Sequence, residues 1–352
     1  MCGIVGYVGD RDCADVLVDA LSKLEYRGYD SAGIAVFEKG TIKVEKCKGR
    51  LANLVDKMAV DGKPQGHCGI GHTRWATHGE PSDINSHPHG NKRVSIVHNG
   101  IIENYKQIKD FLVEEGYSFV SETDTETVAK LLDYYYVDDP VDTIIKVLSE
   151  IKGSYALGIM FRDYPDTVFA VRKESPLIVG VGENENFLAS DVPAIIKYTR
   201  DYYLLEANEI AVVKKDSVQI YDMHKEPVHK EINTADWDVD AAEKGGYEHF
   251  MLKEIHEQPA AVRDTVSPRI VNGMPDLSQD GVDMQKLKDY RQIFIVACGT
   301  AMHAGMVGKY VIEKLARKPV IVDIASEFRY RDPIITKDDL MIVISQSGET
   351  AD

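Results

Sequence analysis

The sequence predicts two units of different fold class: an α+β unit with mostly antiparallel sheets over residues 1–240, and an α/β unit with a parallel sheet after residue 285. The first prediction depends on many short β-rich runs, with a few amphipathic helical segments between them, before residue 236. The second depends on a strand–helix–strand series in the last 70 or so residues. The length of 352 residues is also typical of about two domains.

The N-terminal unit begins with an apolar run that predicts a strand at Gly3–Gly9. Apolar residues at helical spacing then predict a helix at Ala14–Tyr26. The runs Ala32–Phe37 and Thr41–Cys47 flank Glu-Lys-Gly and indicate a hairpin. A stretch rich in Gly, His, Pro and Asn runs from residue 66 to 91 and interrupts the periodic pattern. Loops of that length tend to be functional.

The second half of this unit is expected to contain a strand at Val94–His98 and a helix at Tyr105–Glu115. Thr123 and Glu126 have the spacing of a capping box, which would open a helix running to about Tyr136. Further strands are expected at Ser154–Phe161, Thr167–Arg172 and Glu209–Lys214. Strands packed in two layers, with the helices outside, would account for this order.

The pattern changes after residue 236. Residues 241–246 indicate a linker, and residues 247–266 a polar helix. A βαβ series follows, with elements at Gln292–Cys298, Thr300–Ala316, Val320–Ile324 and Leu340–Ser345. So few strands do not complete a doubly wound sheet, so the chain is expected to end inside its second domain. The expected organisation is therefore a domain over 1–240, a linker and helix over 241–284, and an incomplete domain over 285–352.

Charge and composition exclude several functions. Asp and Glu number 57 against 41 Lys and Arg, for a net charge of −16, which argues against nucleic acid and anionic membranes as partners. No apolar run approaches the length of a membrane span, and the first residues lack the basic segment of a secretory signal. Five scattered cysteines indicate reduced thiols rather than a disulfide framework. A cytoplasmic protein is expected.

Cys2 is the most informative candidate for catalysis. Removal of Met1 would leave a thiol and a free α-amino group on one residue. The amine titrates near ~7.7–8.0 and the thiol near ~8.5, so the amine could take the thiol proton at neutral pH. A small apolar side chain at the start of a strand is the alternative interpretation.

Asn99 and Gly100 end a strand in an Asn-Gly dipeptide. An Asn amide and the N–H of the next glycine can point at one developing oxyanion, although an ordinary turn has the same sequence. Asp124, in the first turn of a predicted helix, could bind a ligand ammonium or only stabilise the helix.

Six of the 11 histidines fall between His67 and His98. Their spacing does not match common metal sites, so a polar substrate-binding loop is favoured over a metal centre. Within this stretch Arg74, Trp75, Thr77 and His78 offer a cation, an aromatic lid and polar donors, which suit a small ligand with a carboxylate. A surface loop with one packed tryptophan is the alternative.

Two strand-to-helix junctions of the C-terminal unit carry hydroxyl side chains. Thr300 follows Cys298-Gly299, and the segment Ser345–Thr350 reads Ser-Gln-Ser-Gly-Glu-Thr. Hydroxyls and free N–H groups at helix N-termini can bind a phosphate without lysine. Plain helix capping is the alternative.

Together these segments resemble the glutamine–fructose-6-phosphate aminotransferase (isomerising) family, also called glucosamine-6-phosphate synthases. The resemblance extends over essentially the whole chain, and the joint order of the motifs makes it specific. The motifs are Cys2–Gly6, Leu24–Gly33, His72–Pro81, His87–His89, Val97–Asn104, Ser121–Glu126, Ala297–Thr300, Ala325–Arg331 and Ser345–Asp352.

The resemblance implies a class II glutamine amidotransferase domain with the four-layer αββα N-terminal-nucleophile fold, followed by the start of a sugar isomerase (SIS) domain. It implies that Cys2 is the nucleophile that releases ammonia from glutamine, with its own amine as base. Asn99 and Gly100 would form the oxyanion hole. No cofactor or metal is implied.

The resemblance also assigns the two substrate pockets. For glutamine, Arg74 and Asp124 would hold the α-carboxylate and α-amino groups with help from Thr77 and His78, and Trp75 would gate the ammonia route. For the sugar phosphate of fructose 6-phosphate, the matching positions are Thr300, Ser345, Gln346, Ser347 and Thr350.

Two features depart from the family pattern. Ala301 stands where a serine often follows Cys-Gly-Thr. The part of the family's sequence that carries isomerisation, and much of its dimer interface, is also missing. The complete enzyme would be a homodimer, and this chain alone at most a glutaminase. The alternatives are another class II amidotransferase, such as the purine-pathway phosphoribosyl enzyme, or a non-catalytic sugar-phosphate-binding fragment.

Overall fold

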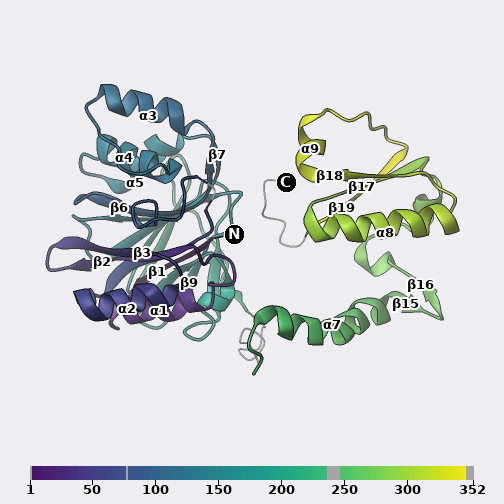
Figure 1. The fold of residues 1–352 in the computed structure, drawn as a ribbon, viewed down its shortest axis with the longest axis horizontal. Coiled ribbons are helices and arrows are strands. Elements are labelled where there is room, and N and C mark those ends of the chain that lie inside the picture. Colours follow the sequence, from purple (N-terminus) through teal and green to yellow (C-terminus); the bar gives the residue numbers. More distant parts are fainter. Residues whose placement is uncertain (1, 77, 236–245, 346–352) are drawn as a thin grey trace. The chain divides into compact units, whose positions relative to one another are not determined.

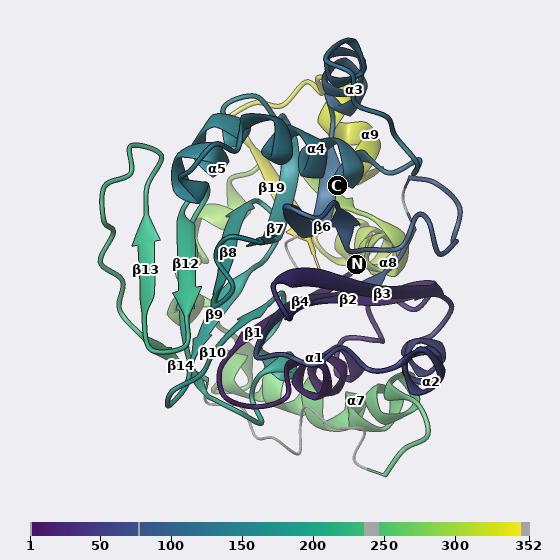
Figure 2. The same ribbon diagram turned by 90° about the vertical axis from the view of Figure 1, so that its left-hand side faces the viewer.

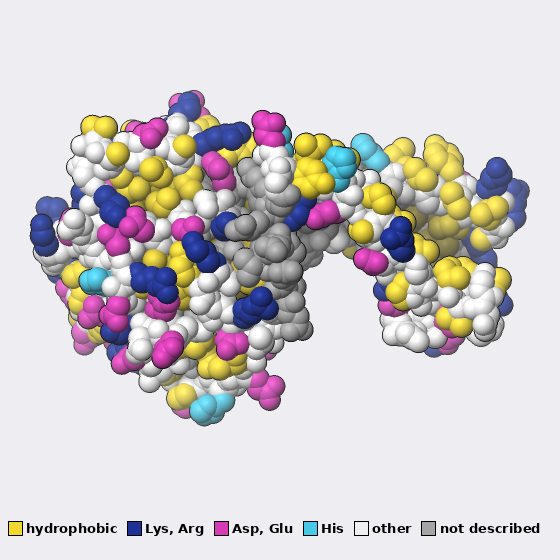
Figure 3. Space-filling model, turned by 90° about the horizontal axis from the view of Figure 1, so that it is seen from below, with side chains coloured by type: hydrophobic (Ala, Val, Ile, Leu, Met, Phe, Trp, Pro, Cys, Tyr) yellow, Lys and Arg dark blue, Asp and Glu magenta, His cyan; other side chains and the backbone are white. Residues whose placement is uncertain are grey.

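The computed structural model describes residues 2–76, 78–235 and 246–345. It divides into two compact units, one ending at Gly246 and the other beginning at Tyr247. Among the described helices, none is long and apolar enough to cross a membrane. On the face drawn in Figure 3, basic and acidic side chains are interspersed.

Two antiparallel sheets form the centre of the N-terminal unit (Figure 1). The eight-stranded sheet has the order β14-β11-β9-β10-β1-β4-β2-β3 and the six-stranded sheet β13-β12-β8-β7-β6-β5. The strands of the first are β1 (Gly3–Val8), β2 (Ser31–Glu38), β3 (Thr41–Lys48), β4 (Cys68–Arg74), β9 (Ile178–Val181), β10 (Asn186–Ala189), β11 (Asp201–Leu204) and β14 (Asn233–Thr234). Those of the second are β5 (His89–Gly90), β6 (Val94–Ile102), β7 (Gly153–Phe161), β8 (Thr167–Lys173), β12 (Ile210–Lys214) and β13 (Val218–Tyr221).

Helices cover the two outer faces of this pair of sheets. Figure 2 shows α1 (Cys13–Ser22) and α2 (Leu51–Asp61) beside the eight-stranded sheet, and α3 (Tyr105–Glu114), α4 (Asp124–Tyr135) and α5 (Pro140–Leu148) beyond the six-stranded one. Strand β1 is buried on both faces because its side chains alternate between two cores. Ile4 and Val8 pack between the sheets, whereas Val5 and Tyr7 pack under α1. The predicted αββα class is thus confirmed.

Strand β4 corrects the prediction of a loop over residues 66–91. Cys68–Arg74 pairs with both β1 and β2 inside the eight-stranded sheet. A Cβ on Gly69 would lie 2.7 Å from the Cys13 sulfur of α1, and one on Gly71 would lie 3.0 Å from Leu21. These glycines therefore let α1 approach the sheet closely, and they also remove the apolar pattern that marks a strand.

Several helices of the N-terminal unit differ from expectation in their boundaries, caps or presence. Helix α1 ends at Ser22, four residues early, and α2 and α5 were not predicted. At α4 the Thr123 hydroxyl accepts from the Glu126 N–H, as a capping box requires. The Glu126 carboxylate instead accepts from the N–H groups of Val120 and Ser121 and from the Ser121 hydroxyl, so it fastens the preceding loop.

The C-terminal unit contains a small parallel sheet of order β18-β17-β19. Its elements are α7 (Phe250–Val266), the hairpin β15 (Ile270–Val271) and β16 (Met274–Pro275), then β17 (Gln292–Ala297), α8 (Gly299–Leu315), β18 (Val320–Ile324), α9 (Ala325–Tyr330) and β19 (Asp339–Ile344). The chain passes from β17 to β18 on one side and then places β19 on the other. The βαβ prediction therefore holds.

Candidate active site

Cys2 lies immediately before β1, beside the end of β4. Because Gly3 pairs with Thr73, the Cys2 thiol lies next to the backbone of Trp75. The sulfur accepts a hydrogen bond from the Trp75 N–H at 3.1 Å and lies 3.4 Å from the Trp75 carbonyl oxygen. The thiol is therefore held by backbone groups at one end of the eight-stranded sheet.

Asn99 brings the six-stranded sheet to the same place. It is buried on β6, and its Nδ2 donates to the Cys2 carbonyl oxygen at 3.0 Å. Its Oδ1 lies 3.0 Å from Nε2 of His72. Since an amide nitrogen carries two hydrogens, one remains for a ligand.

Gly100 has a backbone that other residues do not adopt readily. Its φ is +121°, and a Cβ there would lie 2.0 Å from the Ser154 carbonyl oxygen on β7. Glycine thus allows β6 to stay paired with β7 directly after Asn99.

Arg74 is a buried cation at the end of β4. Its Nη2 donates to the carbonyl oxygens of His78 and Gly79. Its Nη1 is buried and has no hydrogen-bond partner among the described residues. A buried guanidinium with a free N–H edge is suited to a carboxylate ligand.

Asp124, the first residue of α4, is also buried. Its Oδ2 accepts from the Ile102 N–H at 2.8 Å and lies 4.0 Å from Nδ1 of His98. The carboxylate therefore fixes the chain just after Gly100.

The other predicted glutamine-pocket residues lie after β4. Trp75 is 48% exposed and packs edge-on against Tyr29, with ring centroids 5.1 Å apart. His78 packs edge-on against Tyr105 at 5.4 Å. Thr77 lies outside the described residues.

The environment of the Cys2 thiol keeps it protonated. Burial raises its pKa above the ordinary value, and Asp30 raises it further, while the N–H of Trp75 and the charge of Arg74 act in the opposite direction. Because the net effect is a raised pKa, nucleophilic attack needs a base at the sulfur.

A cluster of buried histidines lies behind Asn99: His72, His87, His89 and His98. Burial lowers the pKa of each, to about 3 for His72. The described residues hold no group of three or more His, Cys, Asp or Glu side chains placed to bind a metal ion. The sequence had suggested a substrate-binding loop for these histidines and gave no sign of the contact between His72 and Asn99, which joins two strands of different sheets.

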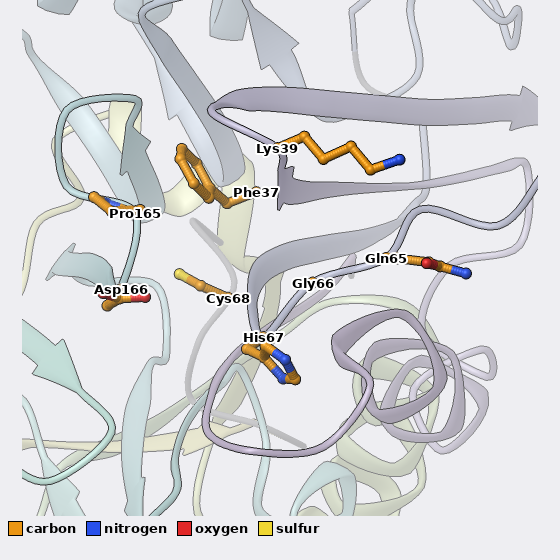
Figure 4. A pocket seen from close by; sticks show the side chains of 8 residues that line it. All are labelled: Phe37, Lys39, Gln65, Gly66, His67, Cys68, Pro165 and Asp166. Carbon is orange, nitrogen blue, oxygen red and sulfur yellow. The ribbon is translucent and has the colours of Figure 1, made fainter.

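A cavity of about 300 Å³ opens at the far end of β4. Figure 4 shows Cys68 there, at the first residue of the strand, with Lys39 and Asp166 also on the lining. Arg74 is six positions further along the extended strand than Cys68, so the two lie roughly 20 Å apart. None of the residues predicted to be catalytic lines this cavity.

In the C-terminal unit, Thr300 and Ser345 follow neighbouring strands. Ala297 pairs with Ile344, so the carboxyl ends of β17 and β19 lie side by side. Thr300 is exposed in the first turn of α8, and Ser345 is exposed just after β19. Gln346, Ser347 and Thr350 lie outside the described residues.

Relatives of known name match the chain from end to end. It is 59% identical over 355 residues to the glutamine–fructose-6-phosphate aminotransferase (isomerizing) of Clostridium acetobutylicum, covering 100% of this chain and 58% of that protein. The protein of that name from Thermus thermophilus is 47% identical over 358 residues, with the same coverage. Over its whole length the chain is thus similar to these aminotransferases. It spans about 58% of the length of these relatives.

Domain models match parts of both units, and solved structures share the fold. A glutamine amidotransferase domain model matches residues 72–197, and a SIS domain model residues 286–352. The glutamine phosphoribosylpyrophosphate amidotransferase of B. subtilis superposes with a TM-score of 0.58 at 19% identity, over 91% of this chain and 65% of that one. An allosteric regulatory enzyme of purine biosynthesis gives 0.57 at 25% identity, over 63% and 49%.

Proposed function

We propose that the chain hydrolyses the side-chain amide of L-glutamine at Cys2. In the complete family member, the ammonia would convert fructose 6-phosphate to glucosamine 6-phosphate. The observation that carries the proposal is the meeting of Cys2, Asn99 and Arg74 at one end of β1, β4 and β6. A nucleophile, an amide donor and a buried cation with a free N–H edge are what an amino-acid amide needs.

Removal of Met1, before any turnover, frees the α-amino group of Cys2. This amine takes the thiol proton, and the sulfur attacks the glutamine δ-carbonyl carbon. The second hydrogen of Asn99 Nδ2 and the Gly100 N–H stabilise the resulting oxyanion. The C–N bond breaks, the protonated amine supplies the proton with which ammonia leaves, and water then cleaves the thioester to give glutamate.

Arg74 and Asp124 bind the other end of glutamine in this proposal. Arg74 Nη1, which has no partner among the described residues, donates to the α-carboxylate, and Asp124 accepts from the α-ammonium. Thr77 and His78 add polar contacts, while Trp75, half exposed beside Cys2, gates the ammonia route. Both charges of the amino acid thus meet a buried opposite charge.

The sugar phosphate is proposed to bind at Thr300 and Ser345, together with Gln346, Ser347 and Thr350, which lie outside the described residues. Because β18 and β19 lie on opposite sides of β17, the junction between β17 and β19 is the switch point of this sheet. Ligands of open parallel sheets bind outside the carboxyl ends of strands at such a point. The free N–H groups at the start of α8 suit a phosphate.

Two alternatives have less support. A purine-pathway phosphoribosyl amidotransferase would share the first fold, but its solved relatives are 19–25% identical, against 47–59% for the aminotransferases. A non-catalytic sugar-phosphate binder would have no use for a buried arginine that lies near a thiol and whose Nη1 has no partner among the described residues.

We also propose the domain limits 1–240 for the glutaminase, 241–284 for the linker and helix, and 285–352 for the SIS segment. The complete protein is proposed to be a cytoplasmic homodimer. The net charge of −16 is compatible with the carboxylate of glutamine and the sugar phosphate because each would bind at a local site and not through the overall field.

The test measures glutamate release from glutamine by the full chain, with glucosamine 6-phosphate formation from fructose 6-phosphate followed in parallel. We expect glutamate release, and we expect little amino sugar from a chain that spans 58% of its relatives' length. Absence of glutamate release from a folded chain with Met1 removed would overturn the proposal.

A further inference from the structure

His72 is the side chain that holds the Asn99 amide from behind. It is buried on β4, and its Nε2 lies 3.0 Å from Asn99 Oδ1 and 3.1 Å from the His98 carbonyl oxygen. Both of these atoms accept hydrogen bonds. The proton of His72 must therefore sit on Nε2, which donates to both.

Two backbone carbonyl oxygens, those of Cys2 and His98, determine which way the Asn99 amide faces. The Cys2 carbonyl needs a donor, which is Asn99 Nδ2 at 3.0 Å. The other amide atom, Oδ1, then faces the Nε2–H of His72. A flipped amide would set an N–H against the Nε2–H of His72 and an oxygen against the Cys2 carbonyl, and both contacts would repel.

Packing keeps the His72 ring in this position and uncharged. It stacks on His87, with ring centroids 4.1 Å apart and planes 20° apart. The His87 ring is itself fixed, since its Nδ1 accepts from the His98 N–H at 3.3 Å. Burial lowers the pKa of His72 to about 3, so the ring stays neutral and its Nδ1 bears no proton.

We propose that His72 is a positioning residue for the reaction at Cys2: its Nε2–H orients the Asn99 amide so that Nδ2, and not Oδ1, faces the developing oxyanion. This inference rests on the proposed function, because the oxyanion forms only if Cys2 attacks an amide. His72 itself does not reach the substrate and takes no proton in the reaction.

The test compares glutamine hydrolysis by the full wild-type chain, His72→Gln and His72→Met. Gln and Met have side chains of similar length, but only Gln supplies an N–H donor. In His72→Met we expect kcat to fall by about tenfold or more, towards the ~10²–10³-fold loss typical of a missing oxyanion donor, with KM for glutamine little changed. In His72→Gln most of kcat should return.

Two controls separate orientation from general damage. His89→Met removes another buried histidine of the cluster, one whose ring contacts Thr123 and Asn85 instead of Asn99, and should keep kcat. In an Asn99→Ala background, His72→Met should cost nothing more, because the donor it orients is already gone.

The outcomes distinguish the two proposals. A folded wild-type chain that releases no glutamate overturns the proposed function. If the wild type is active but His72→Met and His72→Gln have equal kcat, the positioning role is overturned. It is also overturned if the fold-losses in kcat from His72→Met and Asn99→Ala multiply in the double variant. If His72→Met does not fold, nitrogen NMR shifts of the wild-type His72 ring decide: a proton on Nε2 at neutral pH supports the role, and a proton on Nδ1 refutes it.

Discussion

Acidification should destabilise the N-terminal unit well before its carboxylates titrate. The cause is three rings of the buried histidine cluster, those of His72, His87 and His89, whose pKa values burial lowers from the ordinary 6.5. The unfolded chain takes up protons on these rings below pH 6.5, and the folded chain does not. Stability is therefore full above pH 6.5 and is lost as the pH falls towards the native pKa, which is about 3 for His72.

The magnitude follows from the pKa difference. At pH 5 an unfolded histidine is 1.5 units below its pKa, and at about 1.36 kcal/mol per unit each buried neutral ring costs the fold about 2 kcal/mol. The three rings together lower the free energy of unfolding by roughly 6 kcal/mol between pH 8 and pH 5, which is comparable with the 5–15 kcal/mol that stabilises a typical domain.

Urea unfolding at the two pH values, followed by tryptophan fluorescence, measures this loss. Trp75 lies in the N-terminal unit, so its signal reports on that unit. His89→Met should lose about 2 kcal/mol of the pH dependence. A wild-type chain with the same unfolding free energy at pH 8 and pH 5 would refute the reasoning.

Three further predictions concern the site itself. Cys2→Ala should abolish glutamate release, as should an N-terminal extension that blocks the α-amine; a tagged chain of full activity contradicts the amine's role. Asn99→Ala should keep glutamine binding, measured calorimetrically, but lose about 10²–10³ in kcat, and a near-normal rate excludes it as an oxyanion donor. Gly100→Ala should lower the unfolding free energy by more than the ~1–3 kcal/mol of a left-handed residue, because its Cβ meets Ser154. Gly40→Ala, with φ +83° and open space around it, is the control that shows the backbone cost alone in the same urea experiment.

Local patterns in the sequence predicted the elements whose side chains alternate or repeat regularly. The hairpin of β2 and β3 has its turn at Lys39-Gly40, both with positive φ, as the Glu-Lys-Gly sequence indicated. The βαβ series was predicted for the same reason. Strand β4 was not predicted, because its glycines make room for α1 and so interrupt the apolar pattern that marks a strand. The reason for these glycines lies in another element of the fold, helix α1.

The site depended on pairings that no local pattern encodes. Cys2 and Asn99 are 97 positions apart and belong to different sheets, and His72 meets Asn99 only because β4 packs over β6. Motif resemblance therefore named Cys2, Asn99 and Arg74, but it could not say which atom of the Asn99 amide faces Cys2. That answer comes from the carbonyl oxygens of Cys2 and His98, which bind the Asn99 amide and the His72 ring beside it.

The protein is acidic overall, yet its proposed ligands carry a carboxylate or a phosphate. These facts are compatible because each ligand charge is bound at a local site. The net charge of −16 repels a carboxylate only over a screening distance of about 8–10 Å at physiological salt. Arg74 acts inside that distance, buried and with its Nη1 unpartnered among the described residues, where the attraction is screened far less than at the surface. If this is correct, adding salt should change the KM for glutamine only slightly, whereas Arg74→Lys, which keeps the charge but loses the fork of N–H donors, should raise it by about tenfold or more. A KM that is strongly dependent on salt and unchanged in Arg74→Lys would place the recognition of glutamine elsewhere.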